Sequence, residues 1–373
     1  MSHPLLRAWY ATSYGGIAML PFMALLLVSS GLSEGEAAAL LALTPVGLLV
    51  GGPLWAWVAD RTGRRGWILR GAAALAAAGG ALILVSDSVT GLGAGLLLFA
   101  LATAPISPLS DALTVQLLRG DVGAYGAIRS FGSVGFLGAV VVGGAVGGLG
   151  TRAPLVLPVA LLVARAALAW ALPSPATAGA TGVRPALPAS KRLRWLLVAI
   201  FLHGIGLATY DTLFTLHLDH LHLPSWVAGV AMGTGVASEW VLLTRGRAVL
   251  ARVGAGPLLV IALAAGLPRW ALTGLSGQAW VMIATQSLHG LQFGAFWLAA
   301  VSIFSEAAPE GQENQTQALL TAVAFGAAYL ASTGMNAALL SLGGTRTLFL
   351  SMTALSLAAT LIALAVQRER GPR

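Results

Sequence analysis

The chain has 373 residues, of which 57% are hydrophobic and only 9% are charged, and its formal net charge is +8. A soluble domain carries about 25% charged residues, so the composition excludes a soluble globular fold. Cysteine is absent, which excludes disulfide bonds and thiol chemistry.

Apolar runs of about 20 residues recur along the chain and are long enough, as helices, to cross the hydrocarbon core of a bilayer. They are too long for barrel strands and lack the two-residue alternation of such strands. Because the backbone in lipid must satisfy its own hydrogen bonds, the runs predict an all-α, multi-pass membrane protein. We expect twelve spans, at residues 5–30, 37–59, 67–86, 91–117, 124–148, 153–173, 195–218, 225–245, 256–275, 279–304, 314–340 and 346–367.

The first apolar run is predicted to be a span and not a cleaved signal peptide. It contains Pro21 and the polar residues Tyr10, Thr12, Ser13 and Tyr14, and no Ala-x-Ala site ends it. We therefore count it as the first of the twelve spans.

The basic residues are distributed unevenly between the two sides of the predicted bundle. An even number of spans places both termini on one side, and most of the 21 Lys and Arg residues fall on that side. The loops of the other side hold only Arg152 and Arg346. Because cytoplasmic loops retain Lys and Arg, we expect both termini in the cytoplasm and a bacterial-type inner (plasma) membrane. The positive charge then reflects topology, and we expect a lipid bilayer and no nucleic acid as partner.

One long polar segment, "PSPATAGATGVRPALPASKRLR" at 173–194, is rich in Pro, Ala and Ser and predicts a flexible linker. It divides the chain into an N-terminal six-helix half (1–173), a cytoplasmic linker (174–194) and a C-terminal six-helix half (195–373). Two six-span halves suit a transporter built from repeats, with its binding site near the membrane midplane.

The loop after the second span reads "ADRTGRRG" at 59–66. Gly63 permits a tight turn, and the charges can pair with one another or with helix ends. By itself the loop is a basic anchor of topology. The pattern Asp-Arg-x-Gly-Arg-Arg at this place also resembles the signature loop of the major facilitator superfamily, and with six plus six spans the resemblance covers the whole chain.

This resemblance implies twelve transmembrane helices in two six-helix halves around a central cavity. It also implies a conformational latch on the cytoplasmic side, formed by Asp60, Arg61, Gly63, Arg64 and Arg65. The equivalent loop of the second half, at 244–257, is basic but lacks the pattern.

Ionisable residues inside the predicted spans are candidate functional residues, because an unpaired charge in lipid is costly. Asp111 and Arg129 flank the turn "RGDV" at 119–122, each about nine residues away, so both lie roughly 13 Å into the membrane. An antiparallel helix hairpin would bring them together. They form either a buried ion pair that locks two helices or a substrate-binding pair. A buried ion pair stabilises less well than apolar packing, which favours the second reading.

Arg269 and His289 flank the turn "SGQ" at 276–278 in the same way. His289 lies in "QSLHGLQFGAFW" (286–297), where helical spacing places one polar and aromatic stripe along a single face. An unperturbed His titrates near about pH 6.5. His289 is therefore either a ligand of substrate or proton, or a neutral residue hydrogen-bonded between helices. The stripe consists of Gln286, His289, Gln292, Phe293 and Phe296.

Two further ionisable residues lie in the spans. Glu239, in the eighth span, is either a proton carrier or the partner of an arginine such as Arg269. Arg165, nearer the cytoplasmic end of the sixth span, is expected to snorkel or pack and not to bind substrate.

The seventh span contains a polar stripe of its own. His203, Tyr210 and His217 recur every seven residues, with Asp211 beside them. Such a stripe either lines a cavity or hydrogen-bonds to neighbouring helices.

Four stretches resemble one branch of the superfamily, the group that contains the 3-phenylpropionate permease and is more distantly similar to lactose permease. They are "YGAIRSFGSVGFLGA" (125–139), "YDTLF" (210–214), "GVAMGTGVASEW" (229–240) and "QSLHGLQFGAFW" (286–297). In lactose permease, the charged groups at the matching positions divide between sugar binding and proton coupling. The matching positions here are Asp111, Arg129, Glu239, Arg269 and His289.

Two positions depart from the lactose permease pattern. Gln292 stands where that protein has a carboxylate, so a coupled proton must be carried elsewhere. Phe136 stands at the sugar-stacking Trp, although Phe still stacks on an apolar ring face. Arg129 and Arg269 would suit a carboxylate, because guanidinium binds it bidentately.

These features predict a secondary active transporter that moves a small organic solute, a sugar or an aromatic or organic acid, by alternating access as a proton-coupled symporter. The alternatives are a solute/proton antiporter that exports a sugar or drug-like compound, and a lipid-handling or sensor protein on the same fold. An enzyme is not expected, since the sequence has no His-Glu-x-x-His, Gly-x-Ser-x-Gly or phosphate-loop motif. We expect a monomer without metal or cofactor, driven by the proton gradient. The candidate substrate-binding residues are Asp111, Arg129, Phe136, Tyr210, Asp211, Arg269, His289 and Gln292, and the candidate proton-coupling residues are Glu239, His289 and Asp111.

Overall fold

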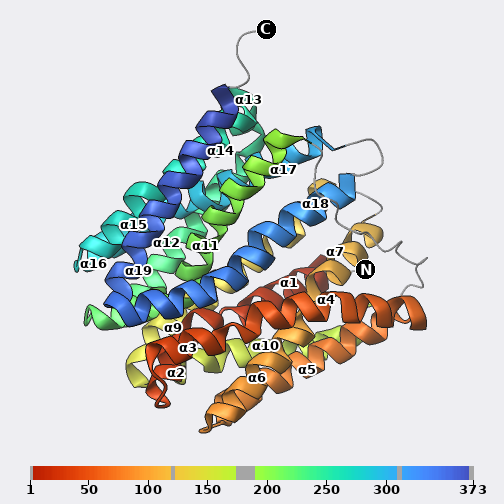
Figure 1. Cartoon of the computed structure of the whole chain (residues 1–373). Helices are drawn as coiled ribbons and strands as arrows, with labels where there is room; N and C mark the ends of the chain where they lie inside the picture. Colours follow the sequence, from red (N-terminus) through yellow and green to blue (C-terminus); the bar gives the residue numbers. More distant parts are fainter. Residues whose placement is uncertain (1–2, 119–121, 174–189, 309–312, 369–373) are drawn as a thin grey trace. The chain divides into compact units, whose positions relative to one another are not determined.

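The computed structural model describes residues 3–118, 122–173, 190–308 and 313–368, and the regular elements in these ranges are all helical. Within them, eleven helical segments are long and apolar enough to cross a membrane. The last, Leu319–Arg368, has 50 residues and is interrupted at Gly343 and Gly344, whose backbone is not helical. It thus contains two successive segments, which correspond to the predicted eleventh and twelfth spans. The predicted all-α, multi-pass membrane fold is confirmed (Figure 1).

The chain divides into two compact units. The N-terminal unit comprises Met1–Thr181 with Pro224–Gly229, and the C-terminal unit comprises Gly182–Leu223 with Val230–Arg373. Most of the predicted linker at 174–194 lies outside the described residues. Its last four residues are helical, because α11 begins at Lys191, and Lys, Arg and Leu are good helix formers.

In the N-terminal unit, α1 packs against α9 and α10, while α5 lies beside both α6 and α10 (Figure 1). Ser33 begins α3 with a capping box, in which its side chain and that of Glu36 satisfy each other's backbone N–H groups. The elements are α1 (His3–Ile17), η1 (Leu20–Phe22), α2 (Met23–Ser29), α3 (Glu34–Leu41), α4 (Leu43–Thr62), α5 (Arg65–Val85), α6 (Val89–Thr103), α7 (Ile106–Leu117), α8 (Val122–Arg129), α9 (Phe131–Val146), η2 (Gly147–Leu149) and α10 (Ala153–Ala171).

Glycine permits the close approach of α1 and α9. A Cβ atom on Gly135 would lie 2.0 Å from the carbonyl oxygen of Ala11, which no side chain tolerates. Small residues serve this purpose in membrane proteins because helices in lipid associate through close van der Waals packing. This contact fixes the position of the α1 face that carries Tyr10 and Tyr14.

The predicted latch loop is a tight turn between α4 and α5. Gly63 has a φ of +62°, a conformation that glycine adopts without strain. Arg61 and Arg64 are exposed, and the Arg61 guanidinium lies 4.5 Å from the centre of the Trp57 ring. The side chains of Asp60 and Arg65 lie outside the described residues, and the latch role stays a prediction.

In the C-terminal unit, α11 packs along α19, which also contacts α14 and α15 (Figure 1). The start of α12, up to Gly229, belongs to the N-terminal unit. The elements from α11 onward are α11 (Lys191–His220), α12 (Trp226–Thr244), α13 (Gly246–Val253), α14 (Ala255–Ala264), α15 (Gly266–Leu275), α16 (Ala279–Thr285), η3 (Gln286–Leu288), η4 (Gly290–Ala295), α17 (Phe296–Glu306), α18 (Glu313–Thr321), η5 (Ala322–Ala327) and α19 (Ala328–Arg368).

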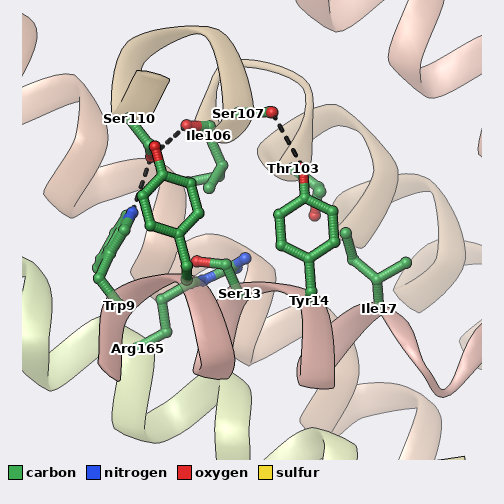
Figure 2. Close-up of a pocket in the computed structure, with 10 residues that line it drawn as sticks. Trp9, Ser13, Tyr14, Ile17, Thr103, Ile106, Ser107, Ser110 and Arg165 are labelled. Atoms are coloured by element: carbon green, nitrogen blue, oxygen red, sulfur yellow. Dashed lines mark hydrogen bonds between the residues drawn. The ribbon is translucent and has the colours of Figure 1, made fainter. Parts of the chain in front are cut away.

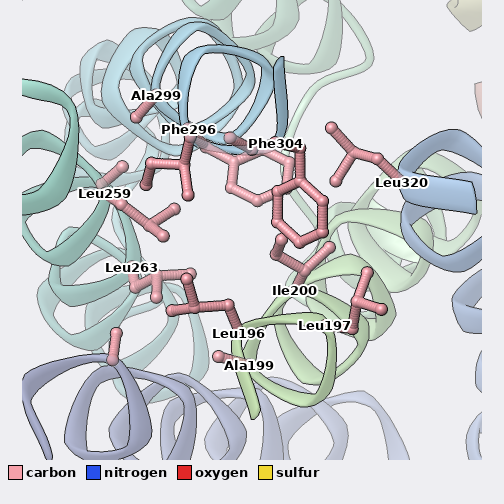
Figure 3. Packing of buried hydrophobic residues seen from close by; sticks show 14 of the residues in the cluster. Leu196, Leu197, Ala199, Ile200, Leu259, Leu263, Phe296, Ala299, Phe304 and Leu320 are labelled. Carbon is pink, nitrogen blue, oxygen red and sulfur yellow. The ribbon is translucent and has the colours of Figure 1, made fainter. Parts of the chain in front are cut away.

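An apolar core holds one end of the C-terminal unit together. Figure 3 shows Leu196 and Ile200 of α11, Leu259 of α14, and Phe296 and Phe304 of α17 converging on it. All five side chains are buried. The polar residues of α11, α15 and the 286–295 segment lie outside this apolar core.

The segment that carries His289 is not a regular α-helix. Residues Gln286–Leu288 form a 3₁₀ turn, and Gly290–Ala295 form a π-helical turn. Such turns recur at functional sites, because they re-aim side chains relative to an α-helix. These turns interrupt the regular α-helix expected for 286–296, yet Gln286 and Gln292 of the predicted stripe still contact the same residue, Arg269.

Candidate functional site

The first group of polar residues lies in the N-terminal unit, at Asp111 of α7 and Arg129 of α8. Both are half-buried. Among the described residues no ion pair joins them directly. The hairpin does bring them into one group, but through two tyrosines of α1, and the direct-pair alternative is not what the structure shows.

Tyr10 and Tyr14 form this bridge. Tyr10 donates a hydrogen bond to Oδ1 of Asp111 at 2.7 Å. Arg129 donates to the Tyr14 hydroxyl and stacks over the Tyr14 ring at 3.9 Å. Tyr14 also contacts the hydroxyl of Ser107 at 3.3 Å, and Ser107 in turn donates to Asp111 at 3.3 Å. Asp111 and Arg129 thus lie on either side of the Tyr14 and Ser107 hydroxyl groups.

Phe136 lies half-buried on α9, seven residues beyond Arg129. No ring contact with another described aromatic residue or cation includes it. The structure therefore does not join Phe136 to the Asp111–Arg129 group by a specific contact.

The second group lies in the C-terminal unit and centres on Arg269 of α15, which is fully buried. Its Nε and Nη2 atoms donate to Oε1 of Gln286 at 3.2 and 2.6 Å, and Nη1 donates to Oε1 of Gln292 at 2.7 Å. The guanidinium carbon lies 4.3 Å from the ring centres of both Tyr210 and Trp270. Amide oxygens and aromatic faces thus stabilise this cation, and among the described residues no carboxylate forms an ion pair with it.

Glu239 of α12 pairs with His289. The distance from Oε2 of Glu239 to Nε2 of His289 is 3.7 Å, and the two side chains are 17% and 10% exposed. His289 also stacks on Phe293, with ring centres 5.6 Å apart and planes 9° apart. Of the two readings of Glu239, partnership with Arg269 is wrong for this structure, because its ion-pair partner among the described residues is His289.

Helix α12 approaches the His289 segment closely enough for backbone contact. Gly290 N–H donates to the Ser238 hydroxyl at 2.9 Å, and a Cβ atom on Gly290 would lie 2.6 Å from the Ser238 carbonyl oxygen. The glycine therefore positions Glu239, the residue after Ser238, against His289.

Asp211 of α11 is hydrogen-bonded to a neighbouring helix. Tyr329 of α19 donates a hydrogen bond to its Oδ2 atom. Tyr210, the preceding residue, instead faces Arg269 and lies 5.6 Å from the ring centre of His289. The consecutive residues Tyr210 and Asp211 of α11 therefore contact different partners, Arg269 and Tyr329.

The histidines of α11 connect helices. His203 contacts the Gln292 carbonyl oxygen through Nε2 at 2.8 Å. His217 contacts the Thr345 hydroxyl at 2.9 Å and the Thr273 carbonyl oxygen at 2.8 Å. Both are buried. For these two residues the hydrogen-bonding alternative holds in this structure.

Sequence reasoning missed the partners that connect these groups. Tyr10 and Tyr14 were visible as polar residues of the first span, and their separation of four residues places them on one helical face. Tyr329 had no comparable signal, since a single tyrosine in an apolar helix is ordinary. Arg165 was expected to snorkel or pack, but it is completely buried, so the snorkelling alternative is wrong.

An all-helical fold of this kind, with charged and aromatic groups held inside its spans, is that of a multi-pass membrane protein. The structure resembles that of a variant of the nucleoside transporter NupG with a TM-score of 0.85, at 14% identity, over 98% of this chain and 99% of that chain. The MFS_1 like family matches residues 5–351, and the chain belongs to this family.

Two curated relatives agree with this membership. The maltose permease of Geobacillus stearothermophilus is 28% identical over 316 residues, covering 83% of this chain and 80% of the relative. The uncharacterized transporter YwbF of Bacillus subtilis (strain 168) is 22% identical over 334 residues, covering 86% and 82%. The resemblance to the major facilitator superfamily is confirmed, while the 3-phenylpropionate permease branch stays a prediction.

Proposed function

We propose that the chain is a proton-coupled symporter, which moves a small organic solute across a bacterial inner membrane by alternating access. Both termini would lie in the cytoplasm, and the monomer would be the transporting unit. The turn at Gly63 with its flanking arginines would act as the conformational latch.

The observation that carries the proton-coupling proposal is the Glu239–His289 pair. Two titratable groups lie 3.7 Å apart and largely shielded from solvent. Ionisable residues inside membrane spans are costly and mark ion and proton pathways. A proton arriving at this pair changes its net charge, and Tyr210 links the pair to Arg269 through ring contacts.

The proposed solute is a sugar or an organic acid. A sugar is supported by the maltose permease among the relatives and by the polar groups around Asp111. An organic acid is supported by Arg129, whose guanidinium fork matches a carboxylate. The proposed solute-binding residues of the N-terminal unit are Asp111, Arg129 and Phe136. Those of the C-terminal unit are Tyr210, Asp211, Arg269, His289 and Gln292.

Uptake into proteoliposomes tests the proposal. Purified protein would be reconstituted and supplied with labelled maltose, other sugars and aromatic acids, with and without an inward proton gradient. Symport predicts accumulation above equilibrium only when the outside is acidic. Accumulation driven by the opposite gradient would support the antiporter alternative, and no acceleration for any solute would sink the transporter proposal for this solute set.

A further inference from the structure

A small cavity in the N-terminal unit lies beneath the Tyr10–Tyr14 face of α1. Its volume is about 40 Å³. Figure 2 shows Ser13 and Tyr14 of α1, Thr103 at the end of α6, Ser107 and Ser110 of α7, and Arg165 of α10 around it.

Arg165 is an unusual residue to find there. Its side chain is completely buried, and its Nε, Nη1 and Nη2 atoms have no hydrogen-bond partner among the described residues. No carboxylate of the described part of the chain forms an ion pair with it either. A buried charge is very costly unless it is paired and hydrogen-bonded, so a guanidinium in this state calls for a partner beyond the described residues.

Two hydroxyl groups beside the same cavity are also buried without a hydrogen-bond partner among the described residues. The Oγ of Ser13 and the Oγ1 of Thr103 are buried and have no hydrogen-bond partner among the described residues. Buried polar groups in native proteins are nearly always hydrogen-bonded, and each exception calls for an explanation. Here the three exceptions belong to residues that line one cavity.

We propose that this cavity is a binding subsite for a carboxylate group, held by the Arg165 guanidinium and the hydroxyls of Ser13 and Thr103. Guanidinium binds carboxylate through two parallel hydrogen bonds, which matches the unpaired donors. Water alone would satisfy donors but would leave the charge uncompensated.

The size of the cavity suits one carboxylate group. A space of roughly 10–15 Å³ holds one water molecule, so about 40 Å³ accommodates a group of a few heavy atoms. The rest of a larger ligand would have to extend past Tyr14, which lines the cavity and also accepts the Arg129 hydrogen bond. The subsite thus adjoins the Asp111–Arg129 group.

The carboxylate can come from two sources: the transported solute or a free small anion such as acetate. The first source rests on the proposed transport function, whereas anion binding itself does not. The experiment therefore begins with binding to the purified full-length protein.

Thermal unfolding in detergent at constant pH and ionic strength would be followed with acetate and benzoate, and with acetamide and benzamide as neutral controls. A ligand that binds the folded state raises the unfolding temperature by mass action. We expect the carboxylates, but not the amides, to raise it. Arg165→Gln should weaken carboxylate binding at least about tenfold, as expected for loss of a charge-assisted hydrogen-bond pair.

Arg70→Gln is the matched control. Arg70 is a partly buried arginine of the same unit, but its guanidinium contacts the Ala169 and Leu172 carbonyl oxygens and two tryptophan rings. Its carboxylate response should equal that of the unaltered protein. Equal stabilisation by amides and carboxylates, or an unchanged response in Arg165→Gln, would overturn the subsite.

Smaller substitutions keep the test decisive if Arg165→Gln does not fold. Ser13→Ala and Thr103→Val retain the cation and remove one hydroxyl donor each. Each should weaken carboxylate binding by a few fold, and no change in both would overturn the proposal.

Proteoliposome transport then separates the two sources. Competitive inhibition of a carboxylate solute by acetate, lost in Arg165→Gln, assigns the site to the solute. Stimulation of neutral-solute uptake by acetate, lost in the same variant, assigns it to a free anion. Absence of all transport with intact carboxylate binding would contradict the proposed function and leave the subsite standing.

Discussion

The carboxylate of Glu239 lies 3.7 Å from Nε2 of His289, and the π-helical turn after His289 lies against α12 through the Ser238–Gly290 contact. The two titratable groups come from different helices and are held by backbone packing, not by one flexible side chain. Under the proposed symport mechanism, a proton bound at this pair would act on the relative position of α12 and the 286–295 segment.

Two substitutions of Gln292, which should affect protein stability differently, test its contact with Arg269. Gln292→Leu removes the acceptor at 2.7 Å from a buried guanidinium and should destabilise the protein by about 1.5–3 kcal/mol. Gln292→Glu keeps an acceptor, adds a neutralising charge, and removes an amide nitrogen that has no hydrogen-bond partner among the described residues. It should unfold at the same temperature or higher. If Gln292→Glu unfolded at a lower temperature than Gln292→Leu, the hydrogen bond from Arg269 to Gln292 would not stabilise the buried guanidinium.

The Tyr329–Asp211 hydrogen bond predicts strong coupling between α19 and α11. Tyr329→Phe and Asp211→Asn should each lower stability, by about 1–2 kcal/mol, because each weakens a hydrogen bond to a half-buried carboxylate. The double variant should cost less than the sum of the two, as measured by a double-mutant cycle on thermal unfolding. Strict additivity would show that the two side chains do not interact.

Two glycines of α9 offer a matched pair for the helix packing. Gly135→Ala should prevent folding or lower stability by about 1–3 kcal/mol or more, because its Cβ would overlap the Ala11 carbonyl oxygen. Gly138→Ala should be neutral or slightly stabilising, since nothing lies within 4 Å of a Cβ there and Ala favours the helix. Size-exclusion profiles and unfolding temperatures measure both, and equal behaviour would contradict the close α1–α9 approach.

The tyrosine bridge predicts a binding defect without a folding defect. Tyr14→Phe removes the hydroxyl that joins Arg129 to Ser107, but it keeps the ring beneath the guanidinium. We expect the KM for uptake to rise about tenfold with little change in unfolding temperature. Thr12→Val, which alters a hydroxyl bonded only to the backbone of its own helix, is the control. A KM for Tyr14→Phe equal to that of the control would exclude a substrate role for the bridge.

The fold followed from the sequence because the length of the apolar runs is a strong signal. The predicted spans agree with the helical segments to within a few residues over most of the chain. One clear difference is the start of α11 at Lys191, inside the predicted linker. There the basic residues Lys191, Arg192 and Arg194 continue the helix beyond its apolar part, so that composition alone does not mark the helix end.

The sequence predicted which charged residues belong to the candidate site, but not the hydrogen bonds and ring contacts that join them. Depth matching placed Asp111 near Arg129 and Arg269 near His289, yet the contacts run through Tyr10, Tyr14 and the glutamines. Matching depth fixes position along the membrane normal but not rotation about each helix axis. The π turn at Gly290–Ala295 alters that rotation further, and nothing in residue periodicity announces it.

The burial of Arg165 could not be predicted from the sequence for a different reason. Residue type and position near a span end predict snorkelling, whereas burial depends on the neighbouring helices. The three unsatisfied polar groups lie on α1, α6 and α10, so only the packing of these helices brings them to one cavity.

Solute movement by Glu239→Gln in proteoliposomes tests most directly whether Glu239 and His289 carry the coupled proton. The substitution keeps the size of the side chain and removes its charge and its titratable proton. We expect accumulation driven by an inward proton gradient to be abolished, while equilibrium exchange of the same solute across the membrane persists. Accumulation at the level of the unaltered protein would contradict a proton-carrying role for Glu239.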